Sequence, residues 1–167
     1  MGWSEDECHI AALKIAIDTA LARKLKTRKS IVNLVIECRL AGHPDVRDEE
    51  ATSIHFGGLL GDRVVVSASF FPSSPPMNPM LVTYQLRYMA TDFDVQGRGY
   101  GALVLSVAED DLRELGVEQI WANGRDTALG FYENVGWRKV EGSEHLSPET
   151  QLPHTVIFKR LDDDTDR

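Results

Sequence analysis

The residues with the clearest chemical use are three glycines at alternate positions, Gly97, Gly99 and Gly101. They join an apolar, aromatic stretch, which is typical of a strand, to a stretch that opens a helix. Glycine has no Cβ, so a ligand can approach the bare main chain. The first N–H groups of a helix have no partner inside it, and the helix dipole adds partial positive charge there. The segment therefore predicts an anion site, best suited to phosphate or pyrophosphate.

The members of this predicted site are Gln96, Gly97, Arg98, Gly99, Tyr100 and Gly101. The guanidinium of Arg98 adds a positive charge. The loop alone leaves its ligand open, because Gly97-x-Gly99-x-x-Ala102 also satisfies the fingerprint of NAD-type dinucleotide sites with alanine in the last place. A glycine-rich turn that only packs is a further interpretation. The choice among these interpretations therefore depends on the elements around the loop.

Composition restricts the function classes. The chain has 167 residues and a net charge of −8, which suits a single globular domain. Without a basic block to neutralise phosphates, we expect no nucleic-acid partner. The two cysteines and five histidines have no metal-ligand spacing, so we expect no metal. No apolar run reaches membrane-spanning length and the N-terminus is acidic, which predicts a cytoplasmic protein with no membrane contact.

Hydrophobic periodicity predicts the elements that must position the loop. Residues 4–26 form an amphipathic helix that opens with a capping box, Ser4 and Glu7, within a helical extension over residues 1–30. Residues 31–40 contain β-branched residues that favour a strand, but Gly42 and a following proline favour a helix, which we expect. The later elements are a hairpin over 53–71 with Gly61-Asp62 at its turn, strands over 81–90, 117–122, 137–140 and 154–159, helices over 101–115 and 128–135, and an acidic tail over 162–167.

This order predicts a mixed α/β fold. A strand, a helix and a strand in succession imply a parallel pair with a right-handed crossover. A dinucleotide-binding fold usually begins with its glycine loop and needs a longer alternation of strands and helices. Here the loop comes only after antiparallel material, so the order disfavours NAD as the ligand.

Two segments carry a resemblance to a known family. Gln96-x-x-Gly99-x-Gly101 resembles the pyrophosphate loop of the GNAT superfamily of N-acetyltransferases, whose pattern is Gln/Arg-x-x-Gly-x-Gly/Ala. Thirty residues on, Ala128-x-x-Phe131-Tyr132-x-x-x-Gly136-Trp137 is similar to the second signature of that superfamily, with tryptophan where the family has phenylalanine. The resemblance is firm over residues 84–159 and extends back to residue 53.

The resemblance implies the fold and the cosubstrate. It implies a mostly antiparallel central sheet over residues 31–161, with helices on both faces and a splayed pair of parallel strands that holds acetyl-CoA. The pantetheine arm of acetyl-CoA would pair like an added strand with Met89, Ala90 and Thr91. Asn123, which with the Pro153-His154 strand resembles a bacterial subgroup, would hydrogen-bond the arm. A turn-forming asparagine before Gly124 is the alternative interpretation.

The resemblance also implies direct acyl transfer to an amine. Main-chain N–H groups near Met89 to Thr91 would stabilise the oxyanion. Tyr132 matches the tyrosine to which the family assigns contact with the cofactor and protonation of the leaving thiolate. Its alternative role is that of a core aromatic residue. The general base is left open among His55, His154, Glu37 and a water chain.

We therefore expect an acetyl-CoA-dependent N-acetyltransferase that acts on a small-molecule or peptide amine, and a homodimer is compatible with the sequence. A GNAT-fold acyl-CoA sensor without turnover is the alternative, and an NAD-type dinucleotide binder is disfavoured. The acceptor is not specified by these residues.

Overall fold

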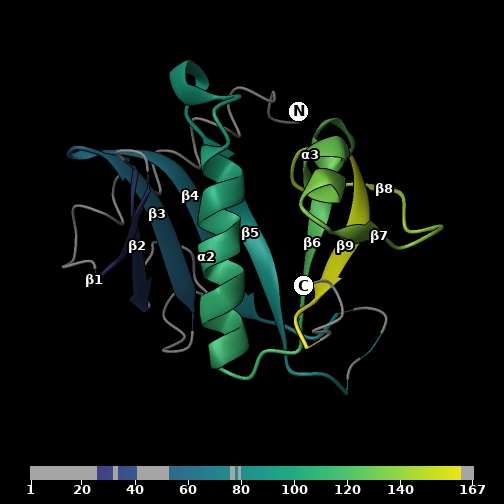
Figure 1. The fold of residues 1–167 in the computed structure, drawn as a ribbon. Helices are drawn as coiled ribbons and strands as arrows, with labels where there is room; N and C mark the ends of the chain where they lie inside the picture. The colour runs from purple at the N-terminus through teal and green to yellow at the C-terminus, as the bar shows by residue number, and fades with distance from the viewer. Residues whose placement is uncertain (1–25, 32–33, 41–52, 76–77, 79, 163–167) are drawn as a thin grey trace.

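The computed structural model describes residues 26–31, 34–40, 53–75, 78 and 80–162 (Figure 1). Two short 3₁₀ helices, η2 and η3, accompany the α-helices and strands. The elements follow in the order β1 (Lys26–Ile31), β2 (Leu34–Leu40), β3 (Ile54–Leu60), β4 (Arg63–Pro72), β5 (Thr83–Thr91), η2 (Phe93–Val95), α2 (Tyr100–Glu114), β6 (Gln119–Arg125), η3 (Asp126–Ala128), α3 (Leu129–Asn134), β7 (Arg138–Lys139), β8 (His145–Leu146) and β9 (Pro153–Arg160).

All the strands belong to one sheet, in the order β1-β2-β3-β4-β5-β6-β9-β7, with β8 paired to β9. Neighbouring strands are antiparallel except β5 and β6, which α2 connects as a crossover helix. The parallel pairing ends at Gln85 and Trp121. Beyond that point β5 continues to Thr91 and β6 to Arg125, and the two strands diverge (Figure 1). The predicted fold class, a mostly antiparallel mixed sheet with one splayed parallel pair, is confirmed.

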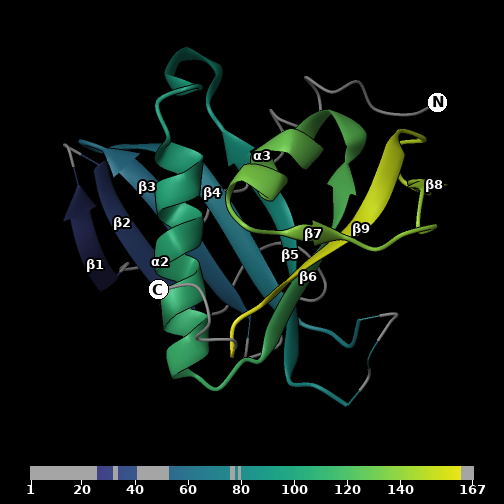
Figure 2. The same ribbon diagram turned by 45° about the vertical axis from the view of Figure 1, so that its right-hand side comes forward.

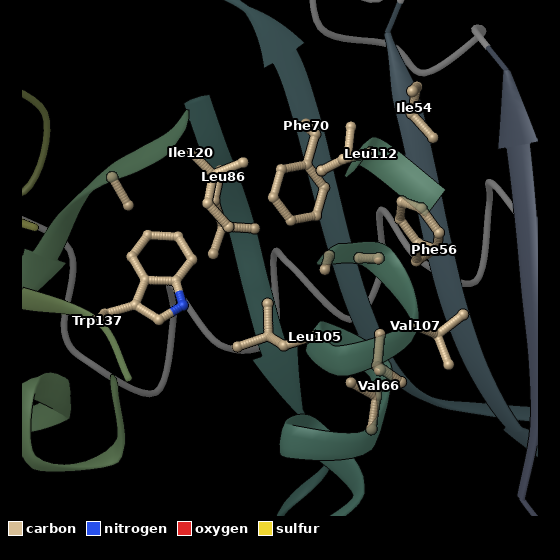
Figure 3. Packing of buried hydrophobic residues seen from close by; sticks show 14 of the residues in the cluster. Ile54, Phe56, Val66, Phe70, Leu86, Leu105, Val107, Leu112, Ile120 and Trp137 are labelled. Carbon is tan, nitrogen blue, oxygen red and sulfur yellow. The ribbon is translucent and has the colours of Figure 1, made fainter. Parts of the chain in front are cut away.

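One face of the sheet, here called the helix face, carries the main hydrophobic core. Both described α-helices, α2 and α3, lie on this face (Figure 2). The amphipathic pattern of α2 turns Val104, Leu105 and Leu112 inward, and each is almost fully enclosed. They pack against strand residues of the same cluster, which include Phe56, Val66, Phe70, Leu86 and Ile120 (Figure 3).

The opposite face of the sheet, here called the far face, is defined by alternation along each strand. Phe70 lies in the core of the helix face, so its neighbours Ser69 and Phe71 lie on the far face. Cross-strand partners share a face, which places Arg87, the partner of Ser69, on the far face as well. The same argument places Asn123 there, between the core residue Ala122 and Gly124.

The helix predicted over residues 31–40 is wrong. Residues Leu34–Leu40 form β2, which pairs with β3 from Leu34 opposite Leu60 to Leu40 opposite Ile54. The β-branched residues thus follow their intrinsic preference, because neighbouring strands on both sides satisfy the main-chain groups of β2. The residues Lys26–Ile31 likewise form β1 and do not close a helical extension. The rest of the predicted N-terminal helix, residues 4–25, and the tail over 163–167 lie outside the described residues.

The later elements match their predictions closely. The hairpin of β3 and β4 turns at Gly61 and Asp62, and Gly61 has the positive φ of 60° that a tight turn requires. The two predicted helices correspond to α2 and α3, the second preceded by η3. The short strand β8 was not predicted. None of the described helices has the length and apolar character to cross a membrane.

Candidate functional site

The loop between β5 and α2 is shaped by two glycines with left-handed backbone. Gly97 has a φ of 76° and Gly99 a φ of 78°, conformations that cost a residue with a side chain about 1–2 kcal/mol. Gly99 stands directly before Tyr100, the first residue of α2. The glycines therefore let the chain turn sharply from the end of β5 into the helix.

The N–H groups at the start of α2 are available to a ligand. Among the described residues, the main-chain N–H groups of residues 97–102 have no hydrogen-bond acceptor. The first intrahelical bond runs from the N–H of Leu103 to the carbonyl of Gly99, at 3.1 Å. Arg98 is exposed, and its guanidinium donates a long hydrogen bond of 3.4 Å to the carbonyl of Asp94. This row of donors at the positive end of a helix, with a cation beside it, suits an anion such as pyrophosphate.

Gly101 lets α2 pack directly against the end of β5 and against α3. A Cβ at this position would lie 3.2 Å from Oγ1 of Thr91, 3.3 Å from Cε of Met89 and 3.5 Å from Cζ of Phe131. The helices α2 and α3 and the end of β5 thus meet at the Cα atom of Gly101. The packing brings together the predicted loop, the predicted Met89–Thr91 segment and the predicted aromatic pair on α3.

The end of β5 contains a β-bulge beside the predicted oxyanion segment. Ser67 of β4 pairs with Ala90 and Ser69 pairs with Arg87, so β5 has one residue more than β4 in this interval. Tyr88 in the bulge has a positive φ of 55°, and its carbonyl accepts a hydrogen bond from the Ser67 hydroxyl at 3.1 Å. On its other side this stretch of β5 has no strand partner among the described residues, so its edge is available to an extended ligand.

Gln96 fixes the position of the loop relative to β5. Its side-chain amide Nε2 donates to the carbonyl of Thr91 at 3.1 Å. Gln96, the first residue of the pyrophosphate-loop pattern, therefore has a structural role in this chain. It joins the start of the anion loop to Thr91, the last residue of β5. The space between the diverging ends of β5 and β6 is called the gap below.

Tyr132 of α3 is buried on the helix face, with 7% of its surface exposed. Its ring contacts Phe131 and Trp137, at centroid distances of 5.1 and 5.3 Å. Its hydroxyl has no hydrogen-bond partner among the described residues. Burial raises the pKa of Tyr132 above the ordinary value for a phenol, although the positive charge of Arg125 opposes this effect. The side chain is thus both part of the core and a protonated donor at neutral pH.

Asn123 lies within β6, opposite Val156 of β9, and its side chain is exposed. The turn-forming interpretation of this asparagine is therefore wrong. It follows Trp121, the last residue of β6 paired to β5, so it lies on the part of the strand that borders the gap. Its side chain is on the far face, whereas the glycine loop and Tyr132 lie on the helix face.

The candidate bases lie at different distances from the gap. His55 is buried on β3, where its Nδ1 lies 2.9 Å from the hydroxyl of Ser69. Glu37 is on β2, opposite Gly57 of β3. Neighbouring strands lie about 4.8 Å apart. Both β4 and β5 lie between β3 and the gap, so His55 is distant from it. His154, by contrast, is on β9 opposite Arg125, at the end of β6 that borders the gap.

The structure also reveals an ion pair beside the diverging strands that the sequence analysis missed. Arg87 and Glu149, on β5 and in the β8–β9 turn, form an ion pair at 3.2 Å. No local pattern marks either residue, because the pair joins positions 62 residues apart. Among the described residues, no group of three or more His, Cys, Asp or Glu side chains is arranged to hold a metal ion.

Comparison with known proteins agrees with this geometry. A model described as the acetyltransferase (GNAT) family matches residues 28–137. The curated protein "Uncharacterized N-acetyltransferase YitI" of Bacillus subtilis is 32% identical over 118 residues, which cover 68% of this chain and 75% of that protein.

Solved structures show the same fold. A Lactobacillus plantarum protein described as a candidate N-acetyltransferase has a TM-score of 0.59 at 19% identity, over 95% of this chain and 93% of that chain. The GNAT family N-acetyltransferase YhbS of Escherichia coli, solved in complex with CoA, has a TM-score of 0.52 at 17% identity, over 66% of this chain and 60% of that chain.

Proposed function

Since the chain belongs to the GNAT family of acetyltransferases, we propose that it transfers an acetyl group directly from acetyl-CoA to a primary amine. The observation that carries the proposal is the divergence of β5 from β6 beyond Gln85, where no strand of the described residues lies on that side of β5, directly before the glycine loop at the start of α2. An extended, amide-rich arm with a pyrophosphate at one end needs both features, in this order.

Three features of the chain support acetyl-CoA as the cosubstrate. The free N–H groups of residues 97–102 and the guanidinium of Arg98 receive the pyrophosphate, and the edge of Met89–Thr91 receives the arm. Gly101 keeps this edge within reach of the loop. Bound in this way, acetyl-CoA would supply an acetyl thioester at the end of the arm that follows Met89–Thr91.

Two groups of the chain act on the charges that develop during transfer. Main-chain N–H groups near Met89 to Thr91 stabilise negative charge on the carbonyl oxygen. Tyr132 donates a hydrogen bond to the departing sulfur. Because burial raises its pKa, the phenol keeps its proton at neutral pH and is ready to act as this donor.

His154 is the base candidate closest to the gap in strand order, on β9 beside the end of β6. Its Nδ1 is 2.8 Å from the carbonyl of Leu152, and a carbonyl only accepts, so Nδ1 carries the proton. In the neutral ring Nε2 therefore holds the lone pair that can take a proton from the amine. A water chain serves the same purpose if His154 is too distant from the bound acceptor.

A thermal-shift assay with acetyl-CoA, CoA and NAD, followed by a CoA-release assay with a broad amine panel, tests the proposal. We expect acetyl-CoA and CoA to stabilise the protein, NAD to have no effect, and at least one amine to release CoA. Binding of acetyl-CoA without turnover of any amine would favour the acyl-CoA sensor. Absence of stabilisation by either CoA compound would refute the proposed function.

A further inference from the structure

An ion pair links the two parts of the sheet where β5 and β6 have diverged. Nη2 of Arg87 donates to Oε1 of Glu149 at 3.2 Å. Arg87 follows Gln85, the last residue of β5 that pairs with β6. Glu149 belongs to the turn that leads into β9, whose start lies beside the end of β6. The pair therefore spans the gap on the far face of the sheet.

Arg87 is the fixed member of this pair. Its side chain is only 16% exposed, and its guanidinium carbon lies 5.1 Å from the centre of the Tyr88 ring. That ring contacts Phe71 edge-on, at a centroid distance of 6.3 Å. Packing and cation–π attraction thus hold the guanidinium in place, independently of Glu149.

Glu149 is the replaceable member. Its side chain is 73% exposed, and it sits in a turn held by hydrogen bonds from the N–H groups of Glu149 and Thr150 to the hydroxyl of Ser147. An ion pair with so exposed a partner contributes only about 0–1 kcal/mol. A competing carboxylate can therefore take its place at little cost.

Backbone strain is concentrated around the same pair. In the part of the chain that the structure describes, Tyr88 and Gln151 are the two non-glycine residues with positive φ, 55° and 58°. Tyr88 is the neighbour of Arg87, and Gln151 lies two residues after Glu149. Strained backbone persists where the surrounding structure requires it, most often at binding sites.

The position of Arg87 relative to the proposed cosubstrate identifies the direction of the acceptor. The glycine loop and Tyr132 are on the helix face, so the pyrophosphate and sulfur lie toward that side. The attacking amine must reach the carbonyl from the side opposite the cosubstrate, which is the far face. Arg87 lies on this face, directly before the bulge that contains Tyr88.

We propose that the acceptor is an amine that also carries a carboxylate, such as an amino acid or a short peptide, and that Arg87 binds this carboxylate in place of Glu149. The inference rests on the proposed acetyl transfer and names its substrate class. The guanidinium offers a planar fork that binds a carboxylate through two parallel hydrogen bonds. In the structure Glu149 occupies this position as an internal carboxylate.

A cationic acceptor such as a polyamine fits the site less well. It would have to bind Glu149, whose side chain is exposed and already paired with Arg87. The fixed, largely enclosed charge on the acceptor side is that of Arg87, which is positive and repels an additional ammonium group. The charge of the fixed residue therefore favours a substrate carboxylate.

The test measures CoA release by the full chain with matched acceptors: amino acids, their α-amides, and the amines that lack the carboxyl group. A hydrogen-bonded charge pair at the acceptor changes kcat/KM by about 10- to 100-fold. We expect the acids to exceed their amides by such a factor. Arg87→Gln should bring the acids to the level of the amides with the KM for acetyl-CoA unchanged, and Arg87→Lys should restore part of the preference.

The variant Glu149→Gln distinguishes a role of Arg87 in acceptor binding from a purely structural role of the Arg87–Glu149 ion pair. It removes the competing carboxylate, so we expect an equal or lower KM for the acids. Arg160→Gln, which removes an exposed ion pair with Asp162 at the other end of β9, is the control and should change neither constant.

Equal use of acids and amides by the wild-type protein, or an equal loss in Glu149→Gln and Arg87→Gln, would overturn the inference while acetyl transfer stands. A protein that is not stabilised by acetyl-CoA would instead overturn the proposed function, and the inference with it.

Discussion

The indole N–H of Trp137 donates a hydrogen bond to Oε1 of Glu109 at 3.2 Å. The ring of Trp137 lies in the core of the helix face (Figure 3). Glu109, on α2, is 7% exposed, and its other oxygen accepts from Nζ of Lys159 at 2.7 Å. Lys159 also donates to the carbonyl of Val135, just after α3. The tryptophan at the last position of the second signature thus has a specific partner in this chain, since phenylalanine would have no donor for this buried carboxylate.

Trp137→Phe should lower the free energy of unfolding by about 1.5–3 kcal/mol, because Glu109 loses a donor in a buried position. Lys159→Met should cost more, because it leaves the carboxylate without its counter-charge. Urea unfolding followed by circular dichroism measures both. An unchanged midpoint in Trp137→Phe would show that the indole N–H contributes nothing to stability.

Gly99→Glu should abolish CoA binding, because it adds a carboxylate where the pyrophosphate binds. Gly116→Glu is the matched control: Gly116 has a similar φ of 81°, ends α2 and has no atom near an added Cβ. Both variants should lose about 1–2 kcal/mol of stability from the left-handed backbone. Isothermal titration with CoA should show loss of affinity in Gly99→Glu alone, and retained affinity there would refute the assignment of the loop.

Tyr132→Phe should lower kcat with little change in the KM for acetyl-CoA, because the hydroxyl acts on the departing sulfur. Loss of such a group typically costs about 100-fold or more in rate. Tyr84→Phe, at a partly buried tyrosine on β5, is the control and should leave kcat unchanged. Unchanged turnover in Tyr132→Phe would mean that another group protonates the thiolate.

The raised pKa of Tyr132 also predicts an alkaline limit to stability. Its pKa in the folded chain lies above the ordinary 10.0, so below that pH the group is protonated in both states and has no effect. As the pH rises past 10.0 the unfolded chain loses this proton while the folded chain keeps it, and stability falls. Tyr132→Phe should therefore lose less stability than the wild type as the pH rises from about 10 to about 11, measured by urea unfolding. Parallel curves for the two proteins would contradict the burial of the phenol.

Gly101→Ala should weaken acetyl-CoA binding, because its Cβ would press on Thr91 and Met89 at the edge of β5. Gly130→Ala in α3 is the control, since no atom lies within 4 Å of its added Cβ. The control should gain about 0.4–1 kcal/mol from helix propensity and lower unfolded-state entropy. Equal affinities for acetyl-CoA in both variants would show that the contact around Gly101 does not set the position of β5.

The sequence by itself determined the features that depend on neighbours along the chain. The glycines of the anion loop, the amphipathic pattern of α2 and the Gly61-Asp62 turn each work through local backbone preference or periodicity. The two signatures, thirty residues apart, were therefore sufficient to identify the family and the parallel pair between them.

The tertiary structure decided what depends on residues far apart in the chain. Residues Leu34–Leu40 are a strand because β1 and β3 satisfy their main-chain groups, which outweighed the local signal for a helix end. Tyr88 takes its unusual φ because β4 holds the bulge from the side. The Arg87–Glu149 and Trp137–Glu109 contacts form only when the sheet is assembled, since each contact joins residues of separate elements that folding alone brings together.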